Sequence, residues 1–342
     1  MKNVTRRGLM AGTAIGATAT MMGEFSWSSQ AKAQAPQAGT QAAMAGKQAP
    51  SFYRYKVGDI EVTVVADGVS RFPLPAGFVS NVDTAEVKKA LAGEFYDTEI
   101  FSNNYTPVLI NTGKNLVLID TGLGENGFNQ SKGSNGQLVN NIIASGYDPK
   151  QIDTVIISHF HGDHVNGLLK ADNTLAFPNA VIRVPGQEHK YWMDDAEMNK
   201  QTSERMTGLF KNNRRIFTNA EVAKRVEPYE AGKDIVAGIT SVATNGHSAG
   251  HHSQIVSSGG KSLFVQGDVT HVPYLFVRNP GWHLTFDQDP QMAEATRRKV
   301  YDMLAAEKML VQAFHYPFPS AAYIEKTPTG YREHMIQWSP TL

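Results

Sequence analysis

The sequence predicts a layered α/β fold, in which hairpins of β-strands alternate with helices. Three observations support this prediction: short segments rich in apolar residues, glycine-containing turns that join such segments in pairs, and apolar residues at helical spacing between them. After the first fifty residues, no further shift in composition divides the chain. Two sheets packed face to face, with helices outside them, are therefore expected.

The strands can be placed individually. Three antiparallel hairpins are predicted at residues 53–57 with 60–66, 106–111 with 115–120, and 255–257 with 262–266. Two further strands are expected at 154–158 and 309–313. The first of these is apolar on both faces, so we expect it to be buried between layers.

Helical spacing is found in two other segments. Apolar residues recur over 135–145, and Gly146 stands where a helix commonly ends. A second helix is predicted from the N-cap Asp289 to residue 307, with a proline in its first position. The segment 187–217 allows two interpretations, an ordinary pair of surface helices or a lid over a site.

The N-terminal region differs from the rest of the chain. Arg6 and Arg7 precede an apolar run over 8–22, which is diluted by glycine and threonine and is shorter than the roughly 20 residues of a membrane span. An A-x-A motif at 31–33 offers a cleavage site. These features predict a twin-arginine-type signal peptide over 1–33. A periplasmic or secreted protein without a stable membrane anchor is therefore expected.

Composition limits the partners and the chemistry. Residues 34–50 are predicted to form a flexible leader, and 51–342 a single folded domain. The chain has 32 Lys and Arg against 32 Asp and Glu, with no long run of either sign, so no nucleic-acid partner is expected. Because the chain has no cysteine, disulfides are excluded and metal ligands must be nitrogen or oxygen atoms.

A dense group of potential metal ligands follows the predicted strand at 154–158. His159, His161, Asp163 and His164 fall within six residues at the mouth of that strand. Each imidazole would otherwise need its own hydrogen-bond partner, so this spacing on a loop has few purely structural uses. The pattern therefore indicates a metal site.

Three more candidate ligands occupy loops beside predicted strands: His247, Asp268 and His315. Seven nitrogen and oxygen ligands can hold two cations. Two histidine-rich sites that share a carboxylate favour zinc, with manganese, iron or cobalt as alternatives. Two divalent metal ions, zinc in the first place, are therefore expected.

The order His-x-His-x-Asp-His, His, Asp, His resembles that of the metallo-β-lactamase superfamily, from about residue 52 to the C-terminus. The resemblance implies a single domain with the four-layer αβ/βα sandwich fold and the site at one edge. It also implies two metal sites bridged by Asp268, one formed by His159, His161 and His247 and the other by Asp163, His164 and His315.

Within this superfamily the sequence is similar to the methyl parathion hydrolases. The segment 190–211 follows their active-site region without a gap. This resemblance implies a substrate pocket with Trp192, Leu209 and Phe210, although those enzymes have an aromatic residue where Leu209 stands. Apolar walls around the metals are expected from Trp192, Phe210, Phe160 and Phe128.

The sequence also resembles the acyl-homoserine lactonases, which share the seven ligands. They carry a tyrosine three residues after the bridging aspartate, which contacts the substrate carbonyl, and this sequence has His271 there. Two interpretations of His271 remain, a residue that steadies substrate or leaving group and a surface histidine in a mobile loop. His251, His252 and Asp120 are candidates for the hydrogen bonds that orient ligand imidazoles.

The expected mechanism follows from the predicted metal pair. Two metals that share a water lower its pKa from about 15.7 towards neutrality, so a bridging hydroxide is the expected nucleophile. Asp163 and Asp268 can take its remaining proton as the intermediate collapses. The predicted function is the hydrolysis of a small molecule: a lactone or aryl ester first, an organophosphate triester second.

Other functions share parts of this pattern. An acyl-homoserine lactonase and a non-catalytic periplasmic zinc-binding protein are kept as alternatives, together with a β-lactamase. Cysteine-containing β-lactamases are excluded, and the subclass with only His and Asp ligands lacks a bridging aspartate such as Asp268. A glyoxalase II type thioesterase would have a helical C-terminal domain, which this chain does not resemble. A homodimer is expected from the resemblance alone.

Overall fold

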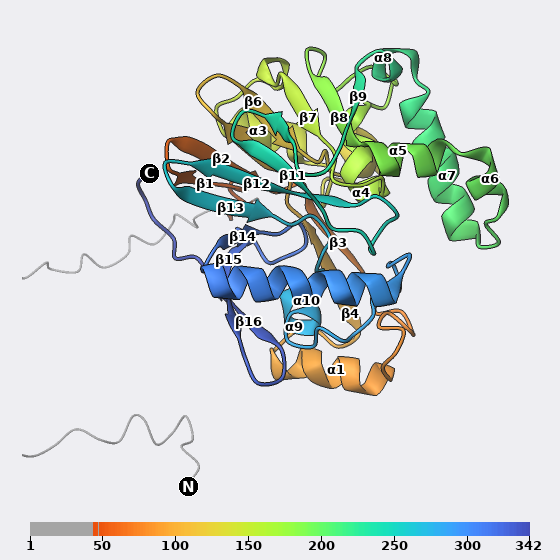
Figure 1. The fold of residues 1–342 in the computed structure, drawn as a ribbon, viewed down its shortest axis with the longest axis vertical. Helices are drawn as coiled ribbons and strands as arrows, with labels where there is room; N and C mark the ends of the chain where they lie inside the picture. The colour runs from red at the N-terminus through yellow and green to blue at the C-terminus, as the bar shows by residue number, and fades with distance from the viewer. Residues whose placement is uncertain (1–43, 47) are drawn as a thin grey trace, which may run out of the picture. The chain divides into compact units, whose positions relative to one another are not determined.

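The computed structural model describes residues 44–46 and 48–342, so the predicted signal peptide and most of the predicted leader lie outside the described residues. Within Gln48–Leu342, two seven-stranded sheets lie face to face (Figure 1). The first contains, in hydrogen-bonded order, β1 (Phe52–Val57), β2 (Ile60–Val65), β5 (Val108–Asn111), β6 (Leu116–Ile119), β7 (Thr154–Ile156), β8 (Val181–Pro185) and β9 (Val226–Tyr229).

The second sheet is formed by the C-terminal half of the chain. Its strands, again in hydrogen-bonded order, are β10 (Asp234–Val236), β11 (Ile239–Ala243), β12 (His252–Ser258), β13 (Lys261–Val265), β14 (Leu310–Gln312), β15 (Ala321–Lys326) and β16 (Tyr331–Met335). A separate antiparallel pair consists of β3 (Gly68–Pro73) and β4 (Ile100–Tyr105).

Helices lie outside the two sheets, and most of them cover the outer faces (Figure 1). They are α1 (Thr84–Gly93), α2 (Gly124–Ser131), α3 (Leu138–Ala144), α4 (Gly162–Val165), α5 (Gly186–Met193), α6 (Asp195–Asn199), α7 (Glu204–Phe217), α8 (Ala220–Ala223), α9 (Pro273–Phe276) and α10 (Pro290–Glu307). Among the described residues, no helix is long and apolar enough to cross a membrane.

Three apolar layers hold the two sheets and their helices together, and a separate cluster joins α1, α9 and β4. Between the sheets, residues such as Val62 of β2 pack in one cluster with Val256 of β12. On the outer face of the first sheet, Val155 belongs to a cluster with residues of α3, α5 and α7. On the outer face of the second sheet, Phe264 and Val311 pack with residues of α10. The predicted four-layer sandwich, helix, sheet, sheet, helix, is confirmed.

The predicted hairpins and the helix after Asp289 are confirmed. The Asp289 carboxylate accepts a hydrogen bond from the Met292 backbone N–H, as expected of an N-cap. The helix predicted over 135–145 is shorter and begins at Leu138, because the buried Asp67 carboxylate accepts the N–H groups of Gly136 and Leu138. This cap comes from a distant part of the chain, so local sequence could not reveal it.

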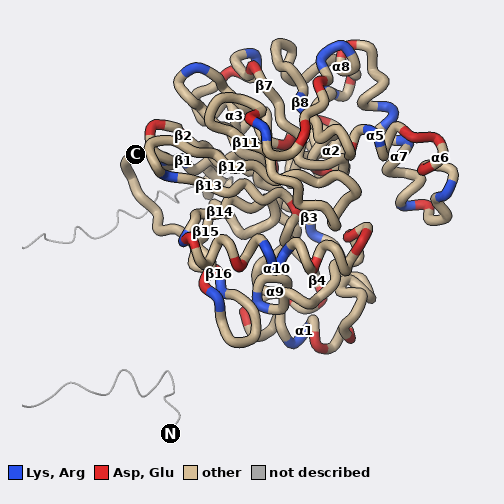
Figure 2. Tube along the Cα trace, viewed as in Figure 1, with Lys and Arg blue, Asp and Glu red and all other residues tan. Residues whose placement is uncertain are grey.

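The segment 187–217 forms most of α5 and all of α6 and α7, which extend from the body of the molecule on one side (Figure 1). Charges of both signs lie along this extension (Figure 2), and Arg214 pairs with Asp195 at 2.5 Å. The apolar faces of α5 and α7 belong to the main cluster on the first sheet. α5 and α7 are thus helices packed on the first sheet.

Candidate metal centre

Four loops at one edge of the two sheets bring the candidate ligands together. The strand β7 lies between the parallel neighbours β6 and β8 and leads directly into the loop with His159 and His161. Asp163 and His164 follow in the first turn of the short helix α4. The other three lie after strands of the second sheet: His247 after β11, Asp268 after β13 and His315 after β14.

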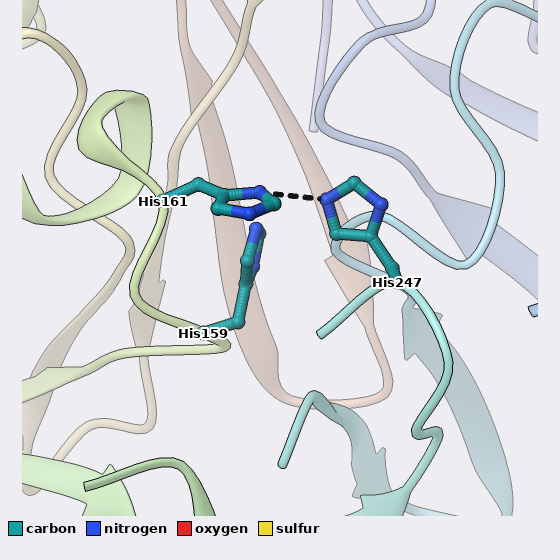
Figure 3. Close-up of side chains that lie close together, drawn as sticks. All are labelled: His159, His161 and His247. Carbon is teal, nitrogen blue, oxygen red and sulfur yellow. Dashed lines mark hydrogen bonds between the residues drawn. The ribbon is translucent and has the colours of Figure 1, made fainter. Parts of the chain in front are cut away.

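His159, His161 and His247 form the first group of ligand atoms. One ring nitrogen of each lies within 4.8 Å of the others. Nδ1 of His161 is 2.9 Å from Nε2 of His247, although the two residues come from different loops (Figure 3). The three rings point towards one another (Figure 3), as expected of imidazoles that share one cation.

Asp163, His164 and His315 form the second group, again with one candidate atom from each residue within 4.8 Å of the others. Asp163 Oδ2 is 3.6 Å from His164 Nε2 and 3.5 Å from His315 Nε2. A carboxylate and two imidazoles are ligands that zinc and other divalent transition metals accept.

Asp268 lies between the two groups. Its Oδ2 is 3.2 Å from His247 Nε2 in the first group and 3.1 Å from His315 Nε2 in the second, and its Oδ1 is 3.4 Å from His164 Nε2. One carboxylate therefore reaches histidines of both groups, which is the arrangement of a bridging ligand.

The unpaired polar atoms of the site fit two cations. Nε2 of His159, Nε2 of His164 and Oδ1 of Asp268 are buried and have no hydrogen-bond partner among the described residues. Buried polar atoms are nearly always paired in folded proteins. Their convergence on a common space is explained if they bind metal ions.

The outer nitrogens of three ligand histidines are held by oxygen atoms. His164 Nδ1 lies 2.8 Å from Asp120 Oδ2, His247 Nδ1 lies 2.8 Å from Asp287 Oδ1, and His315 Nδ1 lies 2.7 Å from the Asn104 carbonyl oxygen. Each acceptor binds the proton on Nδ1, so that Nε2 is the nitrogen that faces the site and can bind a metal.

These contacts decide between the candidates for orienting residues. Asp120 contacts a ligand histidine, and His251 accepts a hydrogen bond from the backbone N–H of Asp268 at 3.0 Å. His252 contacts no ligand; its ring packs on Tyr229 instead. Asp287 was missed because it is forty residues from His247 in sequence and has no motif of its own.

Electrostatics divide the histidines into two kinds. Burial lowers the pKa values of His159 and His161 well below the usual range, so both are neutral. Burial also lowers the pKa of His247, but Asp268 and other carboxylates outweigh burial and raise it to about 9. His164 follows the same pattern, with a pKa held well above its usual value.

The Asp268 carboxylate carries the charge opposite to that of these histidines. Burial raises its pKa, but His315, His164 and His247 outweigh burial and hold the pKa well below its usual range. The bridging carboxylate is therefore ionised, as a metal ligand must be.

A cavity of about 270 Å³ opens onto both groups. Besides ligand residues, it is lined by Phe72, Asn103, Tyr105, Leu123, Arg205, Leu209, His271 and Phe286. Leu209 thus lies where the sequence predicted a substrate contact. His271 is 3% exposed and stacks on the His315 ring with centroids 4.0 Å apart. The interpretation of His271 as a surface histidine is wrong.

The prediction that Trp192 and Phe210 line the substrate pocket needs correction. Both are fully buried in the cluster that joins α5 and α7 to the first sheet, and neither lines the cavity. Their rings lie 4.6 Å apart. Phe160 is likewise a core residue, and Phe128 lines a separate cavity of about 410 Å³. Apolar character alone does not tell which face of a helix meets a pocket and which meets the core.

Comparison with known proteins agrees with this geometry. A model of the metallo-beta-lactamase superfamily matches residues 104–307, which include six of the seven candidate ligands and end shortly before His315. The N-acyl homoserine lactonase AiiA of Bacillus thuringiensis subsp. kurstaki is 24% identical over 227 residues, which cover 59% of this chain and 77% of the lactonase.

Two solved structures share the fold over most of the chain. One is AidC, described as a dizinc quorum-quenching lactonase, with 24% identity and a TM-score of 0.77 over 84% of this chain and 98% of that one. The other is the hydrolase AbOPH of the beta lactamase superfamily, with 27% identity and a TM-score of 0.78 over 86% and 100%. The chain therefore belongs to the metallo-beta-lactamase superfamily and is a metal-dependent hydrolase.

Proposed function

We propose that this protein is a dinuclear metal hydrolase of lactones and esters. The main support for this proposal is that two groups of ligands share Asp268 and line a cavity of about 270 Å³. A protein that only stored zinc would need neither the shared carboxylate nor the opening.

Bound to these residues, two divalent cations would supply a hydroxide nucleophile near neutral pH and polarise the attacked bond. The chain's own residues complete the site. Phe72, Leu209 and Phe286 give the cavity an apolar wall that excludes water from the substrate body. Asp163 and Asp268 also line the cavity, so their carboxylate oxygens can accept the proton that is lost as the intermediate collapses.

The named relatives support a lactone as the substrate and zinc as the metal. AiiA is an N-acyl homoserine lactonase, and AidC is described as a dizinc lactonase in complex with its product. An organophosphate triester is the second candidate. The apolar side chains of Phe72 and Phe286 in the cavity wall favour it. Leu209 speaks against it, because methyl parathion hydrolases have an aromatic residue there, and the burial of Trp192 and Phe210 removes two residues on which the triester interpretation depended.

The test is kcat/KM of the purified, metal-loaded protein against dihydrocoumarin, a long-chain acyl-homoserine lactone, methyl parathion and nitrocefin. We expect a lactone to give the highest value. A dominant value for methyl parathion would make the protein a phosphotriesterase. Turnover of nitrocefin alone, or of nothing, would contradict the proposal. Asp268→Asn provides the control: lost activity with metals retained separates catalysis from mere metal binding.

Two further proposals rest on sequence and resemblance. The Arg6-Arg7 motif and the A-x-A motif at 31–33 support export by the twin-arginine route. Fractionation of cells that carry the wild type or the double variant Arg6→Lys, Arg7→Lys tests this, because the double variant should stay inside. A homodimer is supported by the resemblance, and light scattering after size-exclusion chromatography measures it directly.

A further inference from the structure

One wall of the active-site cavity is polar and comes from strand β4. The side chains of Phe101, Asn103 and Tyr105 alternate with more exposed neighbours and are all buried, so they share one face of the strand. Asn103 and Tyr105 line the cavity. The Tyr105 ring lies edge-on to His315, with centroids 5.7 Å apart. A phenol hydroxyl is thus placed beside the second group of ligands.

Polar side chains lie near this hydroxyl. Asn135 Nδ2 donates to Ser70 Oγ at 3.0 Å, which leaves the Ser70 proton free to be donated onwards. Burial raises the pKa of Tyr105 to about 12, and the neighbouring side chains of Ser70 and Asn103 lower it only in part. The hydroxyl therefore keeps its proton.

No residue in the described part of the chain takes the Tyr105 proton as an acceptor. Oδ1 of Asn103, the nearest candidate on the same strand, has no hydrogen-bond partner at all. A phenol keeps its proton at neutral pH. The hydroxyl is therefore a neutral donor in a residue that lines the cavity, with its proton available to an oxygen atom there.

We propose that Tyr105 is a catalytic residue that donates a hydrogen bond to the substrate oxygen on which negative charge develops. This inference rests on the proposed function. When hydroxide adds to the carbonyl carbon, the electron pair of the C=O double bond moves to that oxygen, and Tyr105 stabilises the resulting charge without transferring its proton. The bond to the leaving oxygen then breaks, and this oxygen departs with the electron pair and gains the proton released to Asp163 or Asp268.

Other polar groups of the cavity are less suited to this role. The guanidinium of Arg205 stacks 4.8 Å above the ring of Phe286, and the residue is solvent-exposed, so it lies at the mouth of the cavity. The His271 ring is stacked on that of the ligand His315. Tyr105 combines burial, a hydroxyl proton that no described residue accepts, and closeness to the ligands.

The test is Tyr105→Phe, which removes the hydroxyl and keeps the ring against His315. Removal of one oxyanion donor costs on the order of 100-fold in kcat, so we expect a loss of roughly 30-fold to 300-fold with KM changed by less than about threefold. Ser70→Ala keeps the donor but removes a neighbouring hydroxyl, and a loss of roughly threefold to tenfold is expected. Tyr331→Phe, on the distant strand β16, is the matched control and should leave kcat unchanged.

Two measurements separate a catalytic from a structural role. Metal content and Tm of Tyr105→Phe should equal those of the wild type. Calorimetric binding of a benzyl phosphonate monoester, which mimics the charged tetrahedral state, should weaken at least tenfold in Tyr105→Phe and not in Tyr331→Phe. A kcat within threefold of wild type, or unchanged phosphonate affinity, would overturn the proposal.

The phosphonate measurement does not depend on turnover. If the wild type hydrolysed no compound of the panel, the proposed function would fail, and the change in phosphonate affinity would still decide whether Tyr105 binds a developing negative charge. If the panel succeeded and Tyr105→Phe behaved like wild type, only the inference about Tyr105 would fail.

Discussion

Asp120 and His164 share a hydrogen bond of 2.8 Å between Oδ2 and Nδ1, inside the protein. The same carboxylate accepts the backbone N–H and the hydroxyl of Ser158, both at 2.8 Å. Asp120 has a φ of 60°, a left-handed conformation that is uncommon for residues other than glycine. Three hydrogen bonds thus hold a strained residue in place, and they join the end of β7 to a metal ligand.

Asp120→Asn should weaken metal binding by roughly 10-fold to 100-fold. The amide offers an N–H where the carboxylate offered an acceptor, so either His164 turns or its proton moves to the nitrogen that faces the metal. Competition with a chromophoric chelator measures the affinity. The matched control is Asp153→Asn: this carboxylate accepts the Leu116 N–H at 2.8 Å, at the opposite end of the same strands. Equal affinities in both variants would contradict the role of Asp120.

Glu188 is fully buried and ties the two ligand loops together. Its carboxylate accepts the N–H of Phe160 at 3.0 Å, the N–H of Gly250 at 2.6 Å and the indole N–H of Trp192 at 2.7 Å. Glu188→Gln replaces one acceptor by a donor and should cost about 2–4 kcal/mol of stability. Urea unfolding of the metal-loaded and metal-free protein measures this loss. The control Glu197→Gln lies in the more exposed helix α6 and should change stability by less than about 0.5 kcal/mol.

Metal ligands were the most predictable part of the site. His159, His161 and Asp163 are close in sequence, and the strand before them fixes where their loop begins. His247, Asp268 and His315 could be found because each follows a strand of apolar residues. Local signals of this kind also gave the hairpins, since a turn and its two strands are adjacent in sequence.

Residues that act across the fold could not be predicted. The Asp67 carboxylate accepts a hydrogen bond from Leu138, 71 residues away, and Asn104 and Tyr105 contact the ligand His315 from a strand pair that the sequence did not reveal. Burial explains the error on Trp192 and Phe210. A helix beside an active site has one face towards the core, and periodicity cannot tell which residues belong to it.

His252 should make the protein less stable in acid. Its ring is buried against Tyr229, and burial lowers its pKa from 6.5 to about 4. The unfolded chain therefore binds the proton more readily than the folded protein. The stability that this residue contributes is fully present above pH 6.5 and is lost as the pH falls through 4, by an amount on the order of 3 kcal/mol.

Denaturant unfolding of metal-free wild type and His252→Phe at pH 7 and pH 4.5 checks this expectation. Other acid-sensitive groups are shared by both proteins, so the difference between the two losses isolates His252. The wild type should lose more stability than the variant over this interval. Equal losses would show that His252 does not contribute to acid sensitivity.

Metal binding should release protons in a pattern set by the ligand histidines. A ligand nitrogen must carry no proton, and in the metal-free protein carboxylates hold the pKa of His247 at about 9 and that of His164 well above its usual value. At pH 7 these two histidines are protonated, while His159 and His161 are already neutral. Loading both sites at pH 7 should therefore release at least two protons.

Calorimetric titration of the metal-free protein with zinc, in buffers of different ionisation enthalpy, counts these protons from the dependence of the measured heat on the buffer. At pH 10, His247 is already neutral in the metal-free protein, so the count should fall by about one. Apparent affinity should accordingly rise steeply with pH up to about 9 and less steeply beyond it. A count of zero at pH 7, or the same count at both pH values, would contradict the charge state assigned to His247. It would also contradict the role of Asp268 and Asp287, which by raising the pKa of His247 hold a proton at the site until a metal displaces it.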